Sequence, residues 1–181
     1  MKPNRVLTRV KWCKPDVGGF KLNADGSVRG NPSLVGGGGG LIRNSEENWC
    51  KGFVRVMGNM TCEMAELWAL KDELSLAHQL GIVNLIIEMD ADMLVLLLKN
   101  NYCNNMLMKP LLSDCRNFLQ RFSNPVVKHI FREANQCADA LAKFGAASVV
   151  FFVVFDNPLP VVENLLAFDK AELFCNRWVC S

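Results

Sequence analysis

The sequence has little of what marks several common classes of protein. Its 181 residues include only two histidines and one tyrosine, and the formal net charge is +2. A net charge so near zero argues against binding of nucleic acid through a broad cationic surface. An apolar fraction of 50% with eleven phenylalanines argues equally against disorder. We therefore expect one folded domain with a substantial core.

Cysteine patterns typical of metal or disulfide frameworks are also missing. The eight cysteines include no C-x-x-C pair, and His78 and His129 lie far apart in the sequence, which disfavours a zinc site. A chain of this size needs no disulfides, and several cysteines fall in apolar helical patterns, so we interpret them as reduced core thiols. Reduced thiols indicate a nuclear or cytoplasmic protein.

Long hydrophobic runs are absent as well. The first residues lack the apolar run of a signal peptide. The longest apolar run, residues 149–155, is far shorter than the roughly 20 residues that a membrane-spanning helix needs. We expect no association with a membrane, and nothing indicates an oligomer, so we expect a monomer.

Composition divides the chain into three parts. Residues 1–14 carry five basic residues and no acid, and we predict a solvated basic arm there, although a contact with nucleic acid is an open alternative. Residues 15–147 are predicted to form the domain. Residues 148–181 are predicted to be an apolar C-terminal extension that packs on the domain or on a partner, with a strand within 149–155 and a short helix at 161–168.

The central part predicts an α/β fold. Apolar and polar residues alternate from residue 20, as in a half-buried strand, and residues 35–43 and 49–56 predict two further strands of an antiparallel meander. Helical spacing follows from residue 60 to about residue 80, and then at 91–99, 107–122 and 133–147, with short strands at 84–89 and 126–131. We expect a five-stranded mixed sheet, with three antiparallel strands and then two parallel ones, flanked by helices.

Four carboxylates fall where solvated faces are not expected. Asp25 lies within a strand, Glu66 is flanked by core residues of a helix, Asp90 ends an apolar strand and Asp139 lies in an apolar helix. Each alone has an ordinary structural explanation, such as an edge-strand position or a helix cap. If they converge, their mutual repulsion requires divalent cations, and oxygen ligands suit Mg²⁺ or Mn²⁺.

The segments around these acids resemble the type 1 ribonuclease H domain. The segments are KLNADGS (residues 21–27), AELWAL (65–70), EMDA (88–91) and HIFREANQCADALA (129–142). Together with Trp12 and the Lys14-Pro15 pair, they are most similar to the plant reverse-transcriptase-like form found in non-LTR retroelements and their host-encoded derivatives. The resemblance covers residues 12–147 and most of the tail.

This resemblance implies a ribonuclease H-like fold and metal-dependent, endonucleolytic cleavage of the RNA strand of an RNA–DNA hybrid. The family's catalytic acids correspond to Asp25, Glu66, Asp90 and Asp139, and its auxiliary histidine to His129. The resemblance also implies that these four acids bind two Mg²⁺ ions, for which Mn²⁺ can substitute. The residues predicted to contact nucleic acid are Gly26, Ser27, Arg29, Thr61 and Asn135.

Two departures from the family pattern leave an alternative function open. Where relatives often carry Thr-Asn-Asn before the catalytic glutamate, this chain has Thr61-Cys62-Glu63, which places an acid where it would repel phosphate. Relatives usually alternate glycine with alanine where residues 36–40 are all glycine. The alternative is a catalytically weak or inactive retroelement-derived module that binds nucleic acid or a partner.

Other chemistries are favoured less. The Asp90-Ala91-Asp92 sequence follows an apolar strand, as in haloacid dehalogenase phosphatases, but that motif is short and normally lies near the amino terminus. A phosphate-binding loop at residues 36–40 would need a Gly-Lys-Ser/Thr sequence, which does not follow. The four acids alone leave integrase or 3′–5′ exonuclease chemistry on the same fold open.

Overall fold

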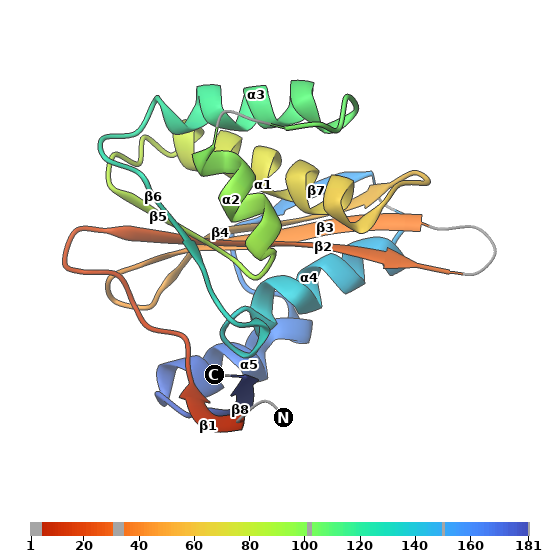
Figure 1. Ribbon diagram of the computed structural model, residues 1–181. Helices are drawn as coiled ribbons and strands as arrows, with labels where there is room; N and C mark the ends of the chain where they lie inside the picture. The colour runs from red at the N-terminus through yellow and green to blue at the C-terminus, as the bar shows by residue number, and fades with distance from the viewer. Residues whose placement is uncertain (1–4, 31–34, 101–102, 150, 181) are drawn as a thin grey trace.

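The computed structural model of the chain describes residues 5–30, 35–100, 103–149 and 151–180. Its centre is a six-stranded sheet in the order β6-β5-β2-β3-β4-β7, and a separate two-stranded sheet pairs β1 with β8 (Figure 1). None of the helices formed by the described residues is both long and apolar enough to span a membrane.

The central sheet combines the predicted meander with two parallel strands. Strands β2, β3 and β4 are antiparallel neighbours, and β5 and then β6 continue the sheet parallel to β2. The expected mixed sheet is therefore confirmed, but it has six strands and not five. The strands are β2 (Phe20–Arg29), β3 (Val35–Asn44), β4 (Trp49–Met57), β5 (Leu85–Met89), β6 (Val126–His129) and β7 (Phe152–Phe155).

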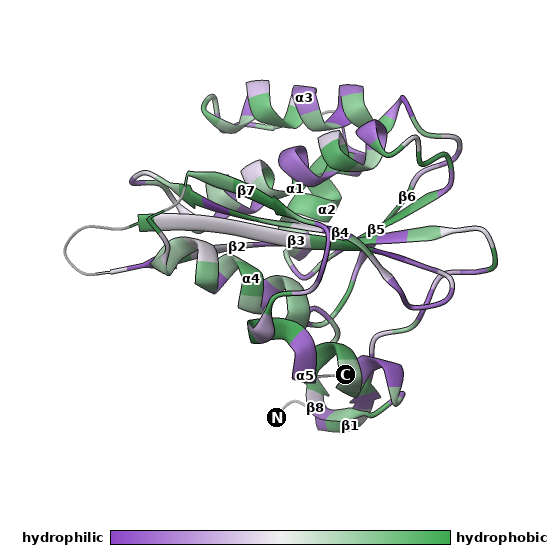
Figure 2. Cartoon of the chain, turned by 180° about the vertical axis from the view of Figure 1, so that it is seen from behind, coloured by the Kyte–Doolittle hydropathy of each residue, from purple (hydrophilic) through white to green (hydrophobic). Residues whose placement is uncertain are grey.

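The sixth strand comes from the apolar run of the C-terminal extension. β7 pairs antiparallel with β4, with Gly52 opposite Phe155. Figure 2 shows β7 as hydrophobic along its whole length at the edge of the sheet. Joining the sheet satisfies the backbone groups of this apolar segment along one side, whereas an isolated strand would leave them unpaired.

Helices cover both faces of the sheet (Figure 1). Helices α1, α2 and α3 lie on one face, whereas α4 lies on the other and packs against α5. The last predicted helix begins three residues late, because a short 3₁₀ turn, η1, precedes it. The helices are α1 (Cys62–Gln79), α2 (Asp92–Lys99), α3 (Met108–Leu119), η1 (Arg132–Ala134), α4 (Gln136–Ala147) and α5 (Pro160–Lys170).

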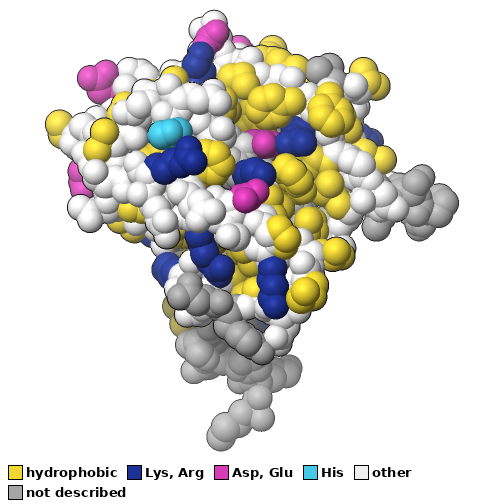
Figure 3. Space-filling view, turned by 90° about the horizontal axis from the view of Figure 1, so that it is seen from above, with side chains coloured by type: hydrophobic (Ala, Val, Ile, Leu, Met, Phe, Trp, Pro, Cys, Tyr) yellow, Lys and Arg dark blue, Asp and Glu magenta, His cyan; other side chains and the backbone are white. Residues whose placement is uncertain are grey.

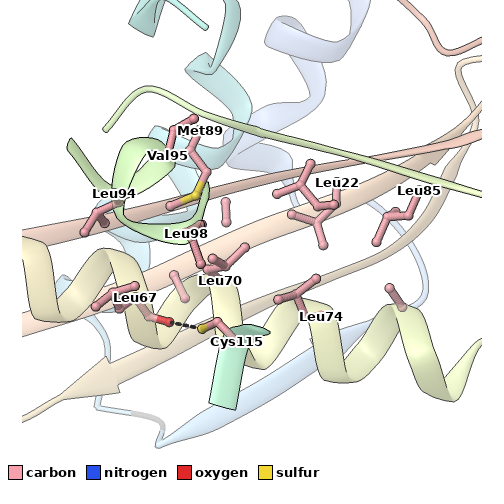
Figure 4. Packing of buried hydrophobic residues seen from close by; sticks show 14 of the residues in the cluster. Leu22, Leu67, Leu70, Leu74, Leu85, Met89, Leu94, Val95, Leu98 and Cys115 are labelled. Carbon is pink, nitrogen blue, oxygen red and sulfur yellow. Dashed lines mark hydrogen bonds between the residues drawn. The ribbon is translucent and has the colours of Figure 1, made fainter. Parts of the chain in front are cut away.

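The main core fills the space between the sheet and the helices α1, α2 and α3. Figure 4 shows Leu67, Leu70 and Leu74 of α1 packed toward Leu22 of β2, and the Cys115 thiol donating to the Leu67 carbonyl at 3.8 Å. Burial raises the pKa of the Cys115 thiol to about 12, so this cysteine is an inert, reduced core residue.

The prediction of reduced core thiols holds only in part. All seven cysteines whose side chains are described are free, but only three of them are buried, and Cys13 and Cys62 are exposed. The buried thiols are Cys103, Cys115 and Cys137.

The glycine run of β3 allows helices to approach the strand from both faces. A Cβ atom added at Gly39 would lie 2.4 Å from the backbone nitrogen of Ala142 in α4. A Cβ atom at Gly38 would instead point to the α1 side, toward Met57 and Ala69. The run is therefore a packing feature inside a strand, and a phosphate-binding loop at this place is excluded.

One buried carboxyl in α1 has no partner. Glu73 is fully buried beneath Gly40, and neither of its carboxyl oxygens accepts or donates a hydrogen bond among the described residues. Burial raises the pKa of Glu73 well above the usual value, and the neighbouring Asp72 adds to this. A glutamate whose folded-state pKa is raised destabilises the fold progressively as the pH rises above its usual pKa.

Replacing Glu73 with methionine, which has a similar volume, is expected to stabilise the protein. At pH 8 the gain should be about 1–3 kcal/mol, because the cost of burying an unpaired polar group disappears. At pH 5 the gain should be smaller, since burial raises the pKa of Glu73 and lower pH favours the uncharged carboxyl in the folded state. Urea unfolding of both proteins at both pH values measures the difference, and a variant less stable than the wild type at pH 8 would contradict this account.

The first and last segments of the chain form a two-stranded ribbon. β1 (Arg5–Val10) pairs antiparallel with β8 (Cys175–Cys180). Residues 5–10 of the predicted arm are mostly exposed, and they also form a strand whose pairing partner lies at the opposite end of the sequence, where it leaves no local pattern. Residues 1–4 of the predicted arm lie outside the described residues.

Candidate active site

The polar side of β2 is buried and not solvated. Lys21, Asn23 and Asp25 alternate along the strand, and each is at most 4% exposed. Lys21 forms an ion pair of 2.8 Å with Glu88 of β5, and the Asn23 amide donates to the same carboxylate at 3.2 Å. The polar alternation of β2 therefore leads to a buried polar strip that ends at Asp25.

Three of the predicted acids converge at the end of this strip. Asp25, Glu66 and Asp90 each offer a carboxylate oxygen, and these three atoms lie within 4.8 Å of one another. The parallel register pairs Asn23 with Glu88, and continuing it by two residues places Asp25 beside Asp90. The carboxyl end of β5 thus brings Asp90 to the central strand, as open α/β sheets do for ligand sites.

Gly26 allows the third acid to approach. A Cβ atom at Gly26 would lie 2.2 Å from the backbone nitrogen of Glu66, so only glycine permits α1 to pack this closely on β2. The backbone of Gly26 also lowers the pKa of Glu66, which partly offsets the effect of burial. The glycine that follows Asp25 therefore places Glu66 against it.

The three acids strongly perturb one another. Burial, with repulsion from Asp90 and Asp139, raises the pKa of Asp25 to about 8. Burial and the negative charge of Asp25 raise the pKa of Glu66 well above its usual value, and the two carboxyl groups share a hydrogen bond. Glu66 Oε2 is buried and has no hydrogen-bond partner among the described residues. A divalent cation would remove the repulsion and use the free oxygen, so the residues present fit an oxygen-coordinated metal such as Mg²⁺ or Mn²⁺.

Asn135 fixes the position of Asp90. Its amide nitrogen donates to Asp90 Oδ1 at 3.2 Å and to the Ala24 carbonyl at 3.1 Å, and its amide oxygen accepts from Asn23. Sequence analysis assigned Asn135 to nucleic-acid contact. The residue is 1% exposed and its amide is occupied within the protein, so its place in the structure is that of a positioning residue.

Asp139, the fourth predicted acid, faces two cations. Its carboxylate accepts from the Arg132 guanidinium and from Lys143 Nζ, the latter at 2.5 Å. It lies near enough to Asp25 to raise the pKa of that residue, but it is not one of the three acids whose oxygens lie within 4.8 Å. The structure thus brings together three of the four predicted ligands and places the fourth beside them in two ion pairs.

The remaining predicted residues lie outside the cluster. His129 ends β6 on the surface, with its ring edge-on to Phe131 at 5.9 Å. Thr61 caps α1, its hydroxyl accepting from the Met64 N–H at 3.3 Å. A hollow of about 350 Å³ begins beside the site, and its lining is formed by Ser27, Val28, Arg29 and Lys143. Arg29 of β2, which is predicted to contact nucleic acid, thus lines the same hollow as Lys143 of α4, which sequence analysis did not identify.

Asn23, Arg132 and Lys143 were missed at the sequence level, although two of them leave a signal. Asn23 lies two residues before Asp25 and therefore shares its face of β2. Lys143 lies four residues after Asp139 and therefore shares its helix face. The position of Arg132 depends on the turn formed by η1, which no periodicity predicts.

The face that carries α1, α2 and α3 has no continuous cationic surface among the described residues. Figure 3 shows lysine and arginine side chains scattered there between apolar and acidic ones. This distribution agrees with the near-zero net charge of the chain.

The fold and the acid cluster together define a ribonuclease H-type domain. One similar solved structure is the N-terminal RNase H domain of a Mycobacterium tuberculosis protein, which is 22% identical, with a TM-score of 0.66 over 71% of this chain and 93% of that one. Another is RNase H1 of Halobacterium salinarum, which is 22% identical, with a TM-score of 0.66 over 71% of this chain and 97% of that one. LC11-RNase H1, isolated from compost and solved in complex with an RNA/DNA hybrid, is 25% identical, with a TM-score of 0.65 over 71% of this chain and 96% of that one.

Residues 23–145 match the family described as reverse transcriptase-like, and the chain belongs to that family. An Arabidopsis thaliana protein, provisionally named a ribonuclease H protein, is 33% identical over 165 residues, which are 91% of this chain. The chain spans 26% of the length of that relative. The resemblance to the reverse-transcriptase-like form of type 1 ribonuclease H is therefore confirmed, and with it the phosphatase alternative at Asp90 is set aside.

Proposed function

We propose that this domain cleaves the RNA strand of RNA–DNA hybrids in a reaction that depends on a divalent metal. The observation that carries the proposal is the convergence of Asp25, Glu66 and Asp90 within 4.8 Å at the carboxyl end of the parallel strands. The hybrid bound to the similar LC11-RNase H1 supports this class of substrate. We also propose that the domain derives from a retroelement and that the protein comes from a plant.

Asp25, Glu66 and Asp90 would hold one Mg²⁺ ion, which Mn²⁺ can replace. A second ion between Asp25 and Asp139 would require Asp139 to give up Arg132 or Lys143 as its partner. Such ions supply Lewis-acid activation of the attacking water and stabilisation of the leaving oxygen.

The chain's own groups orient this acid cluster. Asn135 holds Asp90 through one carboxylate oxygen, and the close packing of α1 on Gly26 fixes Glu66, so both acids are preorganised before a substrate arrives. Arg29 and Lys143 line the adjoining hollow, where they can neutralise phosphates of a bound strand. Exposed His129 would serve as the auxiliary histidine that exchanges a proton with solvent.

Removal of metal is expected to abolish cleavage by the purified protein. With Mg²⁺ or Mn²⁺ it should cut the RNA strand of a short labelled hybrid and leave the DNA strand, single-stranded RNA and duplex RNA intact. Chelation by EDTA should reduce cleavage to background, and added metal should restore it, because three adjacent carboxylates cannot act without a cation. Denaturing gel electrophoresis measures both strands, and an intact hybrid with either metal would contradict the proposal.

A second candidate is a hybrid-binding module without useful turnover. The pairing of Asp139 with two cations favours it, since a second metal site is then occupied by the protein's own charges. Binding of the hybrid with Mg²⁺ present but no cleavage would support this candidate.

A further inference from the structure

The β1–β8 ribbon (residues 5–10 and 175–180) has one face that is exposed to solvent. Residues opposite each other in an antiparallel pair point to the same side, and the register places Leu7 opposite Trp178 and Arg9 opposite Asn176. Leu7 is 48% exposed and Trp178 is 62% exposed. We call this set the outward face, and it consists of Arg5, Leu7, Arg9, Asn176 and Trp178, all of them exposed.

The outward face is cationic around an aromatic ring. The two strands contain three arginines and no acid, and only Arg177, on the opposite side, forms an ion pair among the described residues. Arg5 and Arg9 have no acidic partner there, and the Arg9 guanidinium lies 5.1 Å from the Phe174 ring centroid. Arg5 and Arg9 are about 13 Å apart along the strand, with Leu7 and the cross-strand Trp178 between them.

The ribbon is anchored to the segment that carries the acid site. On its inner side Arg177 contacts both carboxylate oxygens of Glu133 at 2.8 and 2.9 Å, and the Gln136 amide lies 3.4 Å from Cys175 Sγ. Glu133 and Gln136 flank Asn135, which holds Asp90. The outward face is thus fixed to the same turn as the site.

A hollow lies beside the ribbon. It has a volume of about 410 Å³ and lies between β1 and the segment that follows β6. Arg9 and Phe174 line it on the ribbon side, and His129 and Phe131 line it on the other. A polynucleotide strand lying along this hollow would meet Arg9 and the Phe174 ring at one end and the Phe131 ring at the other.

We propose that the outward face binds single-stranded nucleic acid, with an unpaired base stacked on Trp178 and phosphates held by Arg5 and Arg9. An exposed ring between unpaired cations matches sequence-tolerant single-strand binding, and only an unpaired base offers its face to the ring. Two arginines without acidic partners among the described residues favour an occupant that carries phosphates, and a protein contact is an alternative outcome of the test below. The inference rests on the proposed function in one respect: the bound single strand is the unpaired continuation of one strand of the hybrid that the acid site cleaves.

Single-strand binding by the full chain in EDTA tests this proposal. Fluorescence anisotropy with short labelled single-stranded DNA and RNA is compared for the wild type, Trp178→Ala and Arg9→Gln. Trp178→Ala should weaken binding of both strands roughly tenfold, because the stacked base is lost. Arg9→Gln should lower the slope of log affinity against log salt by about 0.7, the effect of one phosphate contact on a single strand.

Matched controls separate the outward face from charge and folding. Trp178→Phe retains an aromatic ring, and Arg121→Gln removes one exposed charge at the far end of α3, so both should bind within about twofold of the wild type. Equal cleavage of a blunt hybrid by the wild type and Trp178→Ala would show that the site is intact. A preference for RNA or for DNA, with the same loss in Trp178→Ala, supports the proposal and identifies the strand.

Two outcomes would overturn the inference. One is unchanged affinity of Trp178→Ala and Arg9→Gln for both single strands. The other is self-association of the wild type that increases with concentration in sedimentation velocity. If Trp178→Ala abolishes this association but still binds single strands, the face is a protein contact. Single-strand binding is measured without metal, whereas hybrid cleavage requires metal. Either result can therefore be positive when the other is negative, and the two proposals are tested separately.

Discussion

Asp25→Asn is expected to abolish cleavage of the hybrid and at the same time to make the metal-free protein more stable. Cleavage should fall below about 1% of the wild-type rate, a loss of at least about 2.7 kcal/mol of transition-state stabilisation, because Asp25 is the central metal ligand of the proposed site. Stability should rise because asparagine removes a buried charge that faces Glu66 and Asp90.

The stability gain should depend on pH in a defined direction. The folded-state pKa of Asp25 is about 8, above the ordinary value of about 3.9 for an unfolded chain. The contribution of protonated Asp25 to the stability of the wild type is therefore fully present below about pH 4, and it is lost as the pH rises through about 8. Asp25→Asn should be only slightly more stable than the metal-free wild type at pH 4, and more stable by at least about 2 kcal/mol at pH 8.

Added Mg²⁺ should reduce this difference in stability at pH 8. A ligand at 100 times its Kd stabilises the folded state by about 2.7 kcal/mol, and only the wild type retains the full set of ligands. Thermal unfolding of both proteins, with EDTA and with Mg²⁺, measures the four values. Equal stabilisation of both proteins by Mg²⁺ would show that the ion binds elsewhere.

Asp92→Asn is the matched control for this variant. Asp92 begins α2 two residues after Asp90, but its side chain is exposed and it is not one of the three convergent acids. The substitution removes one carboxylate near the site, as Asp25→Asn does, and both cleavage and the response to Mg²⁺ should remain close to those of the wild type. Loss of cleavage in Asp92→Asn would mean that the wrong acids have been assigned.

The acid cluster was predictable because each acid breaks a strong local pattern. A charge within an apolar strand or helix is costly, and the sequence shows Asp25, Glu66 and Asp90 in such places. Their convergence follows from the parallel pairing of β2 with β5, which the order of strands and helices predicts. The ion pairs of Asp139 were not predictable, since the position of Arg132 depends on the turn at η1.

The buried polar strip and the ribbon could not be predicted from local patterns. Polar alternation in β2 is the usual sign of a solvated face, and only packing shows that Trp12 and Arg43 cover it. The Trp12 indole donates to Asn23 at 3.0 Å, while Arg43 pairs with Asp169 of α5 at 2.7 Å. These contacts join residues up to 126 positions apart, and sequence periodicity carries no information about such pairs.

Gly39→Ala is expected to destabilise the fold strongly although it adds a single methyl group. The added Cβ would lie 2.4 Å from the Ala142 nitrogen and from the Leu141 carbonyl carbon, both backbone atoms of α4. Backbone cannot rotate away as a side chain does, so α4 must move outward by about an ångström to restore ordinary contact distances near 3.5–4.0 Å. The cost should reach about 3 kcal/mol or more, a large fraction of a typical domain stability of about 5–15 kcal/mol.

The same displacement should also impair the site, because α4 carries Asp139 and begins beside Asn135. We expect Gly39→Ala to lower both the urea midpoint and the affinity for Mg²⁺, the latter measured by isothermal titration on the fraction that remains folded.

Gly38→Ala is the control on the opposite face: its Cβ would meet the mobile end of Met57 at 2.5 Å and the Ala69 methyl at 3.2 Å. Its cost should stay within about 1 kcal/mol, because Met57 can change rotamer. Equal destabilisation by the two alanines would mean that general loss of glycine, and not the approach of α4, limits this strand.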